Sequence, residues 1–204
     1  MTKVFPNTAS EFPKADSDRR QAAIALTVWK KSLLFNCNGF TVFDAMGNLV
    51  FRVDNYMDIN KGEIVLMDGA GEPLLTIRRK KLSLGDHWLI FNGEETANPR
   101  LSLKKNVNIL NSTSLANVTA GCGTSPKHVI YRVEGSYAQR CCAVYDDKRR
   151  RVAEIKRKEA VGGAVFGLDV FRLVVEPDLD PAIAMALVIL LEQMFGSRRF
   201  VPHA

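Results

Sequence analysis

Residues 180–196 read DPAIAMALVILLEQMFG, and this stretch carries the signals of one buried helix. Asp180 suits the N-cap, and Pro181 suits the first helical position, where its missing N–H costs nothing. We expect Gly196 to end the helix in a left-handed conformation. Residues 182–191 include no polar side chain, so no face of the predicted helix is suited to water. Such a helix must be surrounded by protein or by lipid.

The length of the predicted helix, 181–195, decides between these surroundings. Its fifteen residues would be about 22 Å long, whereas a membrane span needs about 20 residues to cross roughly 30 Å of hydrocarbon. We therefore expect no transmembrane span and a helix enclosed by the rest of the chain. Aspartate in place of Leu187 or Leu190 should then abolish soluble expression, because it would put a charge into the core.

The residues before this helix have the pattern of an all-β domain. Residues 1–20 mix Pro, Ser, Asp and Lys without periodicity and are expected to form a flexible tail, and residues 197–204 are expected to form a C-terminal tail. From residue 21 onward, short segments rich in Val, Ile, Leu, Phe and Thr alternate with Gly, Asn and Asp turns. The predicted strands are 23–30, 40–44, 49–55, 64–67, 73–80, 88–92, 100–105, 128–134, 141–145, 151–158 and 168–175, with a further short strand at 106–110.

These strands and the helix predict a mainly β fold. The short connections favour antiparallel pairing. Closing the sheet removes its exposed edges, and an apolar helix can fill the interior of the closed sheet. We therefore expect a single domain over 21–196, a closed antiparallel barrel of about twelve strands enclosing the C-terminal helix.

Three predicted hairpins share one register. Their turns begin at Asp44, Asp68 and Asp146, and small or apolar residues follow six, seven and nine positions later. Side chains alternate between the two faces of a strand, so the residues eight, ten and twelve positions after each aspartate should point outward. These outward residues are Arg52, Asp54 and Tyr56 in the first hairpin, Thr76, Arg78 and Lys80 in the second, and Glu154, Lys156 and Lys158 in the third.

Basic residues are clustered along the chain. The net charge is +6, from 28 Lys and Arg against 22 Asp and Glu, and the runs 78–81, 148–151 and 156–158 hold 11 of the 28. Such clusters favour anionic partners, namely lipid headgroups, nucleic acid or acidic proteins. A solvated basic surface without a partner explains the charge equally well. Two of the hairpins place a basic pair at the same outward positions near a strand end. This equivalence is the most specific indication of a functional site in the sequence.

The sequence shows no catalytic or metal-binding signature. The three histidines lack the spacing of a triad or metal site, and no G-x-S-x-G, H-E-x-x-H or Walker motif is present. The four cysteines form no C-x-x-C pair, so the adjacent Cys141 and Cys142 are expected to be ordinary buried thiols. We expect a non-enzymatic protein without a cofactor or metal.

Two further stretches bear on compartment and loops. The N-terminal residues lack the apolar segment of a signal peptide, and Thr2 stands where N-myristoylation needs glycine. We expect an intracellular monomer, cytoplasmic, with the periphery of the plasma membrane or the nucleus as alternatives. Residues 111–127 (NSTSLANVTAGCGTSPK) are expected to form a long loop, either functional or mobile.

Several stretches carry a family resemblance and together cover most of residues 26–196. They are LTVWKKSLLFNCNGFTVFDAMGNLVFRVDNY, LLTIRRKKLSLGDHWLIF, VEGSYAQRCCAVYDDKRR, VAEIKRKEAVGG and GLDVFRLVVEPDLDPAIAMALVILLEQMF. In these the sequence resembles the plant LURP-one-related family, which is similar in fold to the tubby C-terminal domain and to phospholipid scramblases. The resemblance implies a twelve-stranded barrel around a central C-terminal helix, and it implies a link to plant pathogen defence.

The resemblance also implies a ligand. Tubby domains bind phosphoinositide headgroups through basic residues on a strand and the turn that follows it, and LLTIRRKKLSLGDHWLIF looks like that segment. On this basis Arg78 and Lys80 are the expected headgroup ligands, with Arg79 and Lys81 assisting at the barrel rim. Cys141 and Cys142 do not match the palmitoylation cluster of scramblases, so scramblase-like activity is less favoured. The expected ligand residues are Arg78, Arg79, Lys80, Lys81, Lys156 and Lys158.

Two other functions stay open. Basic patches bind nucleic acid without sequence preference, and a basic run can also act as a nuclear import signal. The residues for either role are Lys148, Arg149, Arg150 and Arg151. The barrel could instead be a scaffold for a protein partner.

Overall fold

The computed structural model describes most of the expected domain. The described residues are 22–33, 38–55, 62–81, 83, 85–95, 97–106, 113–121, 128–158 and 167–196. Both predicted tails, 1–20 and 197–204, lie outside this part of the chain, as does Tyr56, one of the predicted outward residues.

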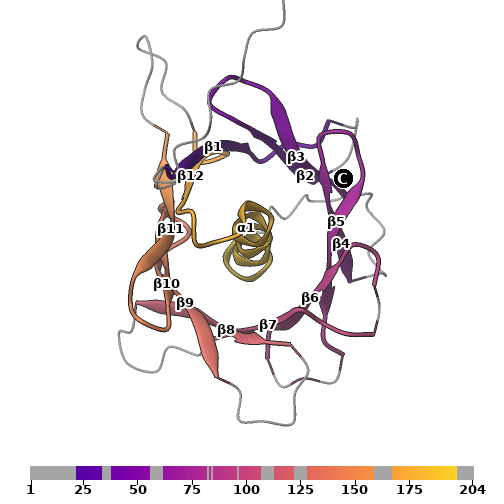
Figure 1. Ribbon diagram of the computed structural model, residues 1–204, viewed down its shortest axis with the longest axis vertical. Helices are drawn as coiled ribbons and strands as arrows, with labels where there is room; N and C mark the ends of the chain where they lie inside the picture. Colours follow the sequence, from indigo (N-terminus) through magenta and orange to yellow (C-terminus); the bar gives the residue numbers. More distant parts are fainter. Residues whose placement is uncertain are drawn as a thin grey trace, which may run out of the picture.

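Within the described residues, twelve strands close into one barrel around one helix, as the sequence predicts (Figure 1). Each strand is hydrogen-bonded to its neighbours in sequence, and β1 pairs with β12 to close the ring. All neighbouring strands are antiparallel, and because the ring is closed none of the twelve described strands is an edge strand. The strands are β1 (Ile24–Trp29), β2 (Asn38–Phe43), β3 (Leu49–Asn55), β4 (Glu63–Asp68), β5 (Pro73–Arg79), β6 (His87–Asn92), β7 (Leu101–Lys105), β8 (Ser114–Ala120), β9 (Val129–Ser136), β10 (Cys141–Asp146), β11 (Arg151–Arg157) and β12 (Val170–Val175).

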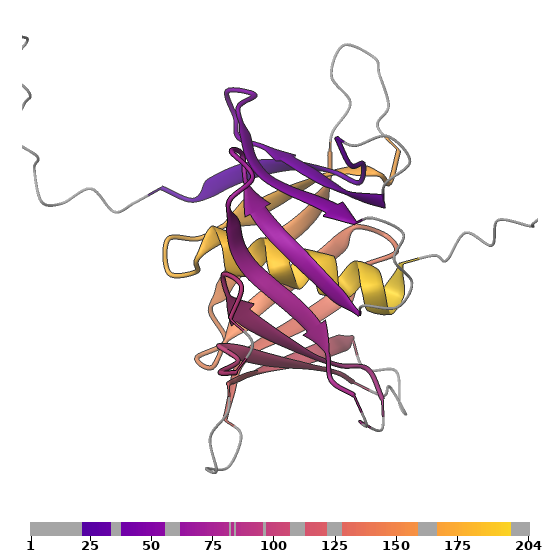
Figure 2. The same ribbon diagram turned by 90° about the vertical axis from the view of Figure 1, so that its right-hand side faces the viewer.

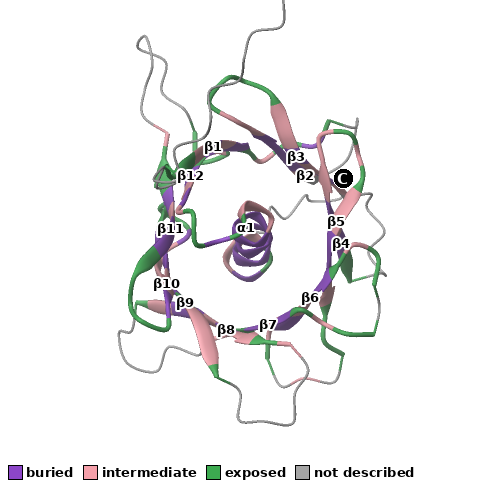
Figure 3. Cartoon of the chain, viewed as in Figure 1, coloured by how far each residue is buried: buried purple, intermediate pink, exposed green. Residues whose placement is uncertain are grey.

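The helix α1 (Pro181–Phe195) lies along the barrel interior (Figure 2). Every residue from Ile183 to Leu191 is buried, and so is Met194. The strands supply alternate apolar side chains against it, for example Leu75 and Ile77 on β5, so the buried surface forms one continuous layer around the helix (Figure 3). The helix is therefore the core of the fold.

The two ends of α1 are capped in different ways. The side chain of Asp180 accepts a hydrogen bond of 2.9 Å from the backbone N–H of Ala182, which confirms the predicted N-cap. The predicted left-handed cap at Gly196 is wrong, because Gly196 has φ −64° and ψ 140°. Glycine is needed there for a different reason: a Cβ atom would overlap the carboxylate and the carbonyl oxygen of Glu192.

The predicted loop at 111–127 is also wrong, because residues 114–120 form β8 between β7 and β9. Ala116 and Val118 point inward and are fully buried, although the segment is rich in small and polar residues. Pairing with two neighbouring strands outweighs its weak intrinsic preference for a strand. The predicted strand at 106–110 is not seen at Asn106, and 107–110 lie outside the described residues.

The three hairpins predicted to share a register do so. In each, the backbone N–H of the first turn residue donates to the carbonyl four positions later: Asp44 to Asn48, Asp68 to Glu72, and Asp146 to Arg150. The fourth residue of each turn has a positive φ, at Gly47 (87°), Gly71 (98°) and Arg149 (64°). The predicted outward positions are confirmed where they are described, although Thr76 is buried and donates to the carbonyl of Gly93.

The two ends of the barrel can now be distinguished. Because neighbouring strands are antiparallel around the ring, all odd-numbered strands finish at one end. The helix follows β12, so it begins at the opposite end and finishes where the odd-numbered strands finish (Figure 2). The helix-entry end holds turns 44–48, 69–72, 93–100, 147–150 and 176–180, and the helix-exit end holds 30–33, 80–86, 137–140 and the last turn of α1.

Candidate functional site

The helix-exit end is strongly basic. Among the described residues, its turns, the two strand residues on either side of each turn and the last turn of α1 carry twelve Lys and Arg against five Asp and Glu. The basic residues are Lys30, Lys31, Arg78, Arg79, Lys80, Lys81, Lys104, Lys105, Arg140, Lys156, Arg157 and Lys158, and the acidic ones are Asp54, Glu63, Asp86, Asp169 and Glu192.

The helix-entry end has the opposite charge. Counted in the same way, with the first turn of α1, it carries ten acidic residues against five basic ones. The acidic residues are Asp44, Asp68, Glu72, Glu94, Glu95, Asp146, Asp147, Glu176, Asp178 and Asp180, and the basic ones are Arg100, Lys148, Arg149, Arg150 and Arg151. The barrel thus has an electric dipole along its axis, with its positive pole where α1 ends.

The predicted ligand residues all lie at the helix-exit end, but they do not form one cluster. Arg78, Arg79, Lys80 and Lys81 lie at the end of β5 and in the turn after it. Lys156 lies near the end of β11, and Lys158 directly follows that strand. β5 and β11 are six positions apart in the ring of twelve, so the two groups occupy opposite sides of the rim (Figure 1).

The two arginines of β5 are already engaged. Arg78 is partly buried: its Nε donates to Glu63 Oε2 at 2.7 Å, and its guanidinium lies 5.2 Å from the ring centroid of Phe91. Arg79 is exposed, and its Nη2 lies 2.9 Å from Asp86 Oδ1. Lys80 and Lys81 are exposed, and neither makes an ion pair with another described residue. The lysines are therefore the more available cations of this group.

At the opposite side of the rim, Lys156 and Lys158 differ in their surroundings. Lys156 is exposed on the outer wall and forms a 2.9 Å ion pair with Glu154 of its own strand. Lys158 is partly buried, and its Nζ lies 3.3 Å from Thr27 Oγ1 of β1. Lys158 also lines a surface depression, and Lys156 is not among the lining residues of that depression.

The third basic run is separated from the other two by the length of the barrel. Arg149 pairs with Glu134, and Arg151 pairs with Glu154 at 2.9 Å. Arg150 contacts Asp146 at 2.7 Å and Asp178 at 3.1 Å. Because acidic residues surround and pair with this run, the helix-entry end has no excess positive charge to offer a polyanion.

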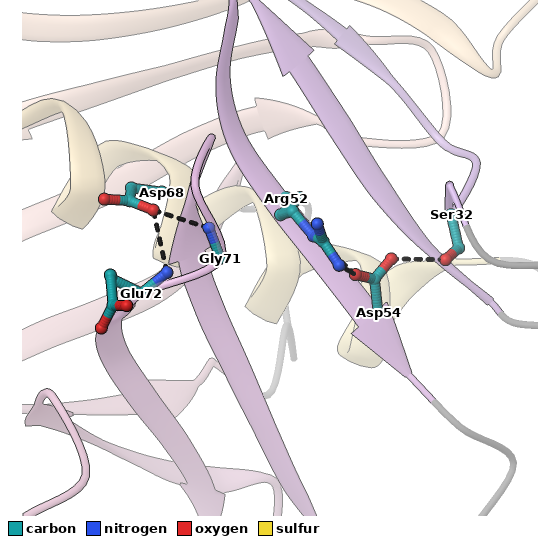
Figure 4. A network of polar contacts seen from close by, with 6 residues as sticks. All are labelled: Ser32, Arg52, Asp54, Asp68, Gly71 and Glu72. Atoms are coloured by element: carbon teal, nitrogen blue, oxygen red, sulfur yellow. Dashed lines mark hydrogen bonds and ion pairs between the residues drawn. The ribbon is translucent and has the colours of Figure 1, made fainter.

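The first hairpin lacks a basic pair, as its sequence indicates. Arg52 on β3 forms an ion pair with Asp54 on the same strand, with Nη2 2.6 Å from Oδ2, and Ser32 donates to Asp54 Oδ1 at 2.6 Å (Figure 4). The turn carboxylate of Asp68 accepts bonds from the N–H groups of Gly71 and Glu72 (Figure 4). The charges of Arg52 and Asp54 are therefore paired with each other.

Large apolar side chains are exposed beside the basic residues of the rim. Trp29 is 41% exposed at the end of β1, Leu33 is 54% exposed in the following turn, and Leu168 is 48% exposed before β12. The three lie in one sector of the rim, because Trp29 pairs with Val170 across β1 and β12. Lys31 lies over the Trp29 ring, 5.2 Å from its centroid.

Arg140 is a buried cation that sequence reasoning missed. It lies in the β9–β10 turn and is only 6% exposed. Its guanidinium lies 4.2 Å from the ring centroid of Tyr137 and 4.4 Å from that of Phe171. Its Nε donates to the carbonyl of Leu168 at 2.8 Å, and its Nη2 lies 3.5 Å from Glu192 Oε2. A single arginine between uncharged neighbours gives no cluster signal in the sequence.

Glu192 joins this arginine to the end of the helix. Its other oxygen, Oε1, forms a 2.6 Å ion pair with Lys30, and the carboxylate is only 10% exposed. Nearby, Lys105 donates to the carbonyl of Met194 at 3.0 Å, which neutralises the partial negative charge at the helix C-terminus. Burial raises the pKa of Tyr137 well above its ordinary value, so this phenol stays neutral.

Two depressions open beside Arg140, and both are lined by Arg140 and Leu168. The first has a volume of about 330 Å³ and reaches Lys30, Asp169 and Glu192. The second has a volume of about 240 Å³ and is lined by Arg140, Arg157, Lys158, Gly167, Leu168 and Val170. The second depression thus has three basic lining residues and no acidic one.

The described part of the chain has no group of three His, Cys, Asp or Glu side chains that could hold a metal ion. No described helix combines the length and hydrophobicity needed to cross a membrane. Cys142 is a buried thiol, as predicted, and burial raises its pKa to about 12. The same prediction is wrong for Cys141, which is exposed because it points outward on β10.

Comparisons with known proteins agree with the fold and the resemblance. The family model described as LURP-one-related matches residues 24–192. Protein LURP-one-related 8 of Arabidopsis thaliana is 54% identical over 97% of this chain and all of its own length. Protein LURP-one-related 17 of the same plant is 42% identical, over 93% of this chain and 91% of its own. An X-ray structure of another Arabidopsis thaliana protein is similar with a TM-score of 0.61 and 25% identity, over 84% of this chain and 90% of that one.

Proposed function

Because the chain belongs to the LURP-one-related family and its barrel has oppositely charged ends, we propose that it is a non-enzymatic module that docks on anionic membrane surfaces. The helix-exit end faces the bilayer. Its basic residues contact lipid headgroups, and Trp29, Leu33 and Leu168 enter the interfacial layer. The proposal assigns the contact to one whole end of the barrel, whereas the sequence points only to the individual residues Arg78, Arg79, Lys80, Lys81, Lys156 and Lys158.

The separation of charge between the two ends is the observation that carries this proposal. An anionic surface attracts the positive end and repels the negative end, so it orients the barrel before contact. The exposed apolar side chains support the same orientation, because tryptophan is enriched at membrane interfaces. Binding of a protein to the membrane surface depends on electrostatic attraction to anionic lipids and on burial of apolar surface. The cations and the exposed tryptophan of this rim can supply both.

The expected affinity is moderate and depends on salt. Each Lys or Arg near an anionic leaflet contributes about 1 kcal/mol, and the effect falls off within a Debye length of roughly 8 Å at physiological ionic strength. Phosphoinositides carry several phosphates per headgroup, so we expect them to bind more strongly than lipids with a single charge. Lys80 and Lys81 are the first expected contacts, because Arg78 would have to share its guanidinium with Glu63.

Vesicle co-sedimentation tests the proposal with a matched pair of charge reversals. Lys80→Glu alters the helix-exit end, and Lys148→Glu alters the helix-entry end. Both lysines are exposed, lie in turns and make no ion pair with another described residue, so neither substitution breaks such a pair. Both substitutions change the net charge by the same amount. On vesicles containing phosphatidylserine or a phosphoinositide, Lys80→Glu should weaken binding by roughly tenfold to thirtyfold, and Lys148→Glu should leave it nearly unchanged.

The same two variants can also contradict the proposal. Equal weakening by both substitutions would mean that binding follows net charge and not the basic end. If neither substitution changed vesicle binding, the residues of the rim would not form the binding site. Vesicles of phosphatidylcholine alone serve as the uncharged control.

A further inference from the structure

We propose that the depression lined by Arg140, Arg157 and Lys158 is a binding pocket for a single phosphate monoester group. The pocket lies at the helix-exit end, between the β9–β10 turn, the end of β11 and the start of β12. It is distinct from the β5 side of the rim, which lies on the opposite side of the barrel. The proposal does not depend on membrane docking, because the pocket would take a phosphate group from solution as well as from a lipid.

The buried guanidinium of Arg140 is the strongest indication of a ligand. Its Nε and Nη2 have partners, but its Nη1 is buried and has no hydrogen-bond partner among the described residues. Leaving a buried donor without a partner destabilises the protein, and more so when the group is charged. A phosphate oxygen that reached Nη1 would remove that cost. Proteins seldom retain such a group without a functional reason.

The surroundings of Arg140 hold its side chain in place. Tyr137 and Phe171 contact the guanidinium and are themselves packed edge to face, with ring centroids 6.5 Å apart. The Leu168 carbonyl fixes Nε, and Leu168 also lines the pocket. The arginine is therefore positioned before a ligand arrives, so a ligand would lose less affinity to ordering of this side chain.

The charges around the pocket suit a phosphate. The two depressions beside Arg140 are lined by four cations, Arg140, Arg157, Lys158 and Lys30, and by two carboxylates, Glu192 and Asp169. This leaves two positive charges in excess. A phosphate monoester carries a charge of about −1.5 to −2 at neutral pH and has three strong acceptor oxygens. A carboxylate would neutralise only half of the excess.

The size of the pocket limits what enters it. Its volume of about 240 Å³ is below the range of roughly 300–1,000 Å³ typical for drug-sized ligands. It therefore suits one phosphate group, with the rest of the molecule left outside. Arg157 already donates through Nε to the carbonyl of Gln139 at 3.0 Å, which leaves its two Nη groups to meet the anion.

Titration with inorganic phosphate, followed by NMR, tests the pocket on the full chain. The Nε–H of Arg140 and the backbone amide of Leu168 report on the site directly. We expect saturable shifts of both signals, with an equal ionic strength of chloride producing none. Arg157→Gln/Lys158→Gln should weaken phosphate binding by about tenfold or more. Lys148→Gln/Arg151→Gln removes the same charge from the helix-entry end, outside both proposed sites, and should leave phosphate binding unchanged.

Vesicles then identify the source of the phosphate. Phosphatidic acid presents a phosphate monoester, whereas phosphatidylglycerol presents a diester, so the two are compared at equal surface charge. Preference for phosphatidic acid that inorganic phosphate competes away supports a lipid source, and saturable phosphate binding without that preference supports a soluble ligand. Absence of saturable shifts, or equal weakening of inorganic-phosphate binding by the two double variants, would overturn the pocket. Failure of all vesicle binding with phosphate shifts intact would instead overturn membrane docking alone.

Discussion

At the scale of single residues, two arginines adopt backbone conformations that usually favour glycine. Arg140 has φ 53° and Arg149 has φ 64°, and no other non-glycine residue in the described chain has a positive φ. In each case the side chain lies over an aromatic ring and contacts a carboxylate. These contacts offset the cost of the left-handed backbone, which is about 1–2 kcal/mol.

The turns of the matching hairpins allow this cost to be measured. Gly71 occupies the position that Arg149 holds in the third hairpin, with φ 98°. Gly71→Ala should lower the free energy of unfolding by about 1–2 kcal/mol, because alanine is strained at positive φ. Arg149→Gly should change it by less than about 1 kcal/mol, since relief of strain and loss of an exposed ion pair nearly cancel. Urea unfolding measures both, and an unaltered midpoint for Gly71→Ala would contradict the assigned turn geometry.

Cys142 makes stability depend on alkaline pH. Burial raises the pKa of its thiol from 9.0 to about 12, so the folded protein keeps a proton that the unfolded chain loses between these values. The free energy of unfolding should therefore be fully retained below about pH 9 and should fall as the pH rises toward 12. Cys142→Ala should flatten this decline when urea midpoints are compared across the window. An equally steep decline in the variant would assign the effect to other groups, such as Tyr137.

At the scale of elements, α1 is the part that the sequence predicts best. Its bounds, its N-cap and its enclosure all follow from residues 180–196, because capping chemistry and an unbroken apolar run act locally. The left-handed conformation predicted for Gly196 is wrong: Gly196 lies against Glu192, whose carboxylate is held by Lys30 and Arg140, and both of these are distant in sequence. For the same reason β8 was missed: Ala116 and Asn117 belong to a strand because β7 and β9 flank them.

The enclosure of α1 predicts a severe effect of charge in its middle. Leu187 is 1% exposed, so Leu187→Asp should abolish soluble expression, whereas Leu187→Ala should cost about 2–5 kcal/mol and still fold. Gln193→Ala on the exposed part of the last turn serves as the control and should change stability by about 0.5 kcal/mol or less. Soluble, fully folded Leu187→Asp protein would show that the helix does not fill the barrel.

At the scale of the whole molecule, the arrangement of charge depends on topology. Runs 148–151 and 156–158 are close in sequence, yet β11 places them at opposite ends of the barrel. Runs 78–81 and 156–158 are far apart in sequence and share an end, because β5 and β11 have the same direction. The sequence shows the basic clusters, but assigning each cluster to one end of the barrel requires the full strand count. Sequence reasoning missed Arg140 because its partners, Leu168 and Glu192, are distant in sequence.

Quenching of Trp29 by brominated lipids tests the orientation on the membrane most directly. Trp29 lies exposed at the helix-exit end, whereas Trp88, the second tryptophan of the chain, is buried in the core. On vesicles that contain brominated phosphatidylcholine and an anionic lipid, part of the fluorescence should be quenched, and Trp29→Phe should abolish the quenching. Binding without quenching, or quenching that survives Trp29→Phe, would contradict docking through this end of the barrel.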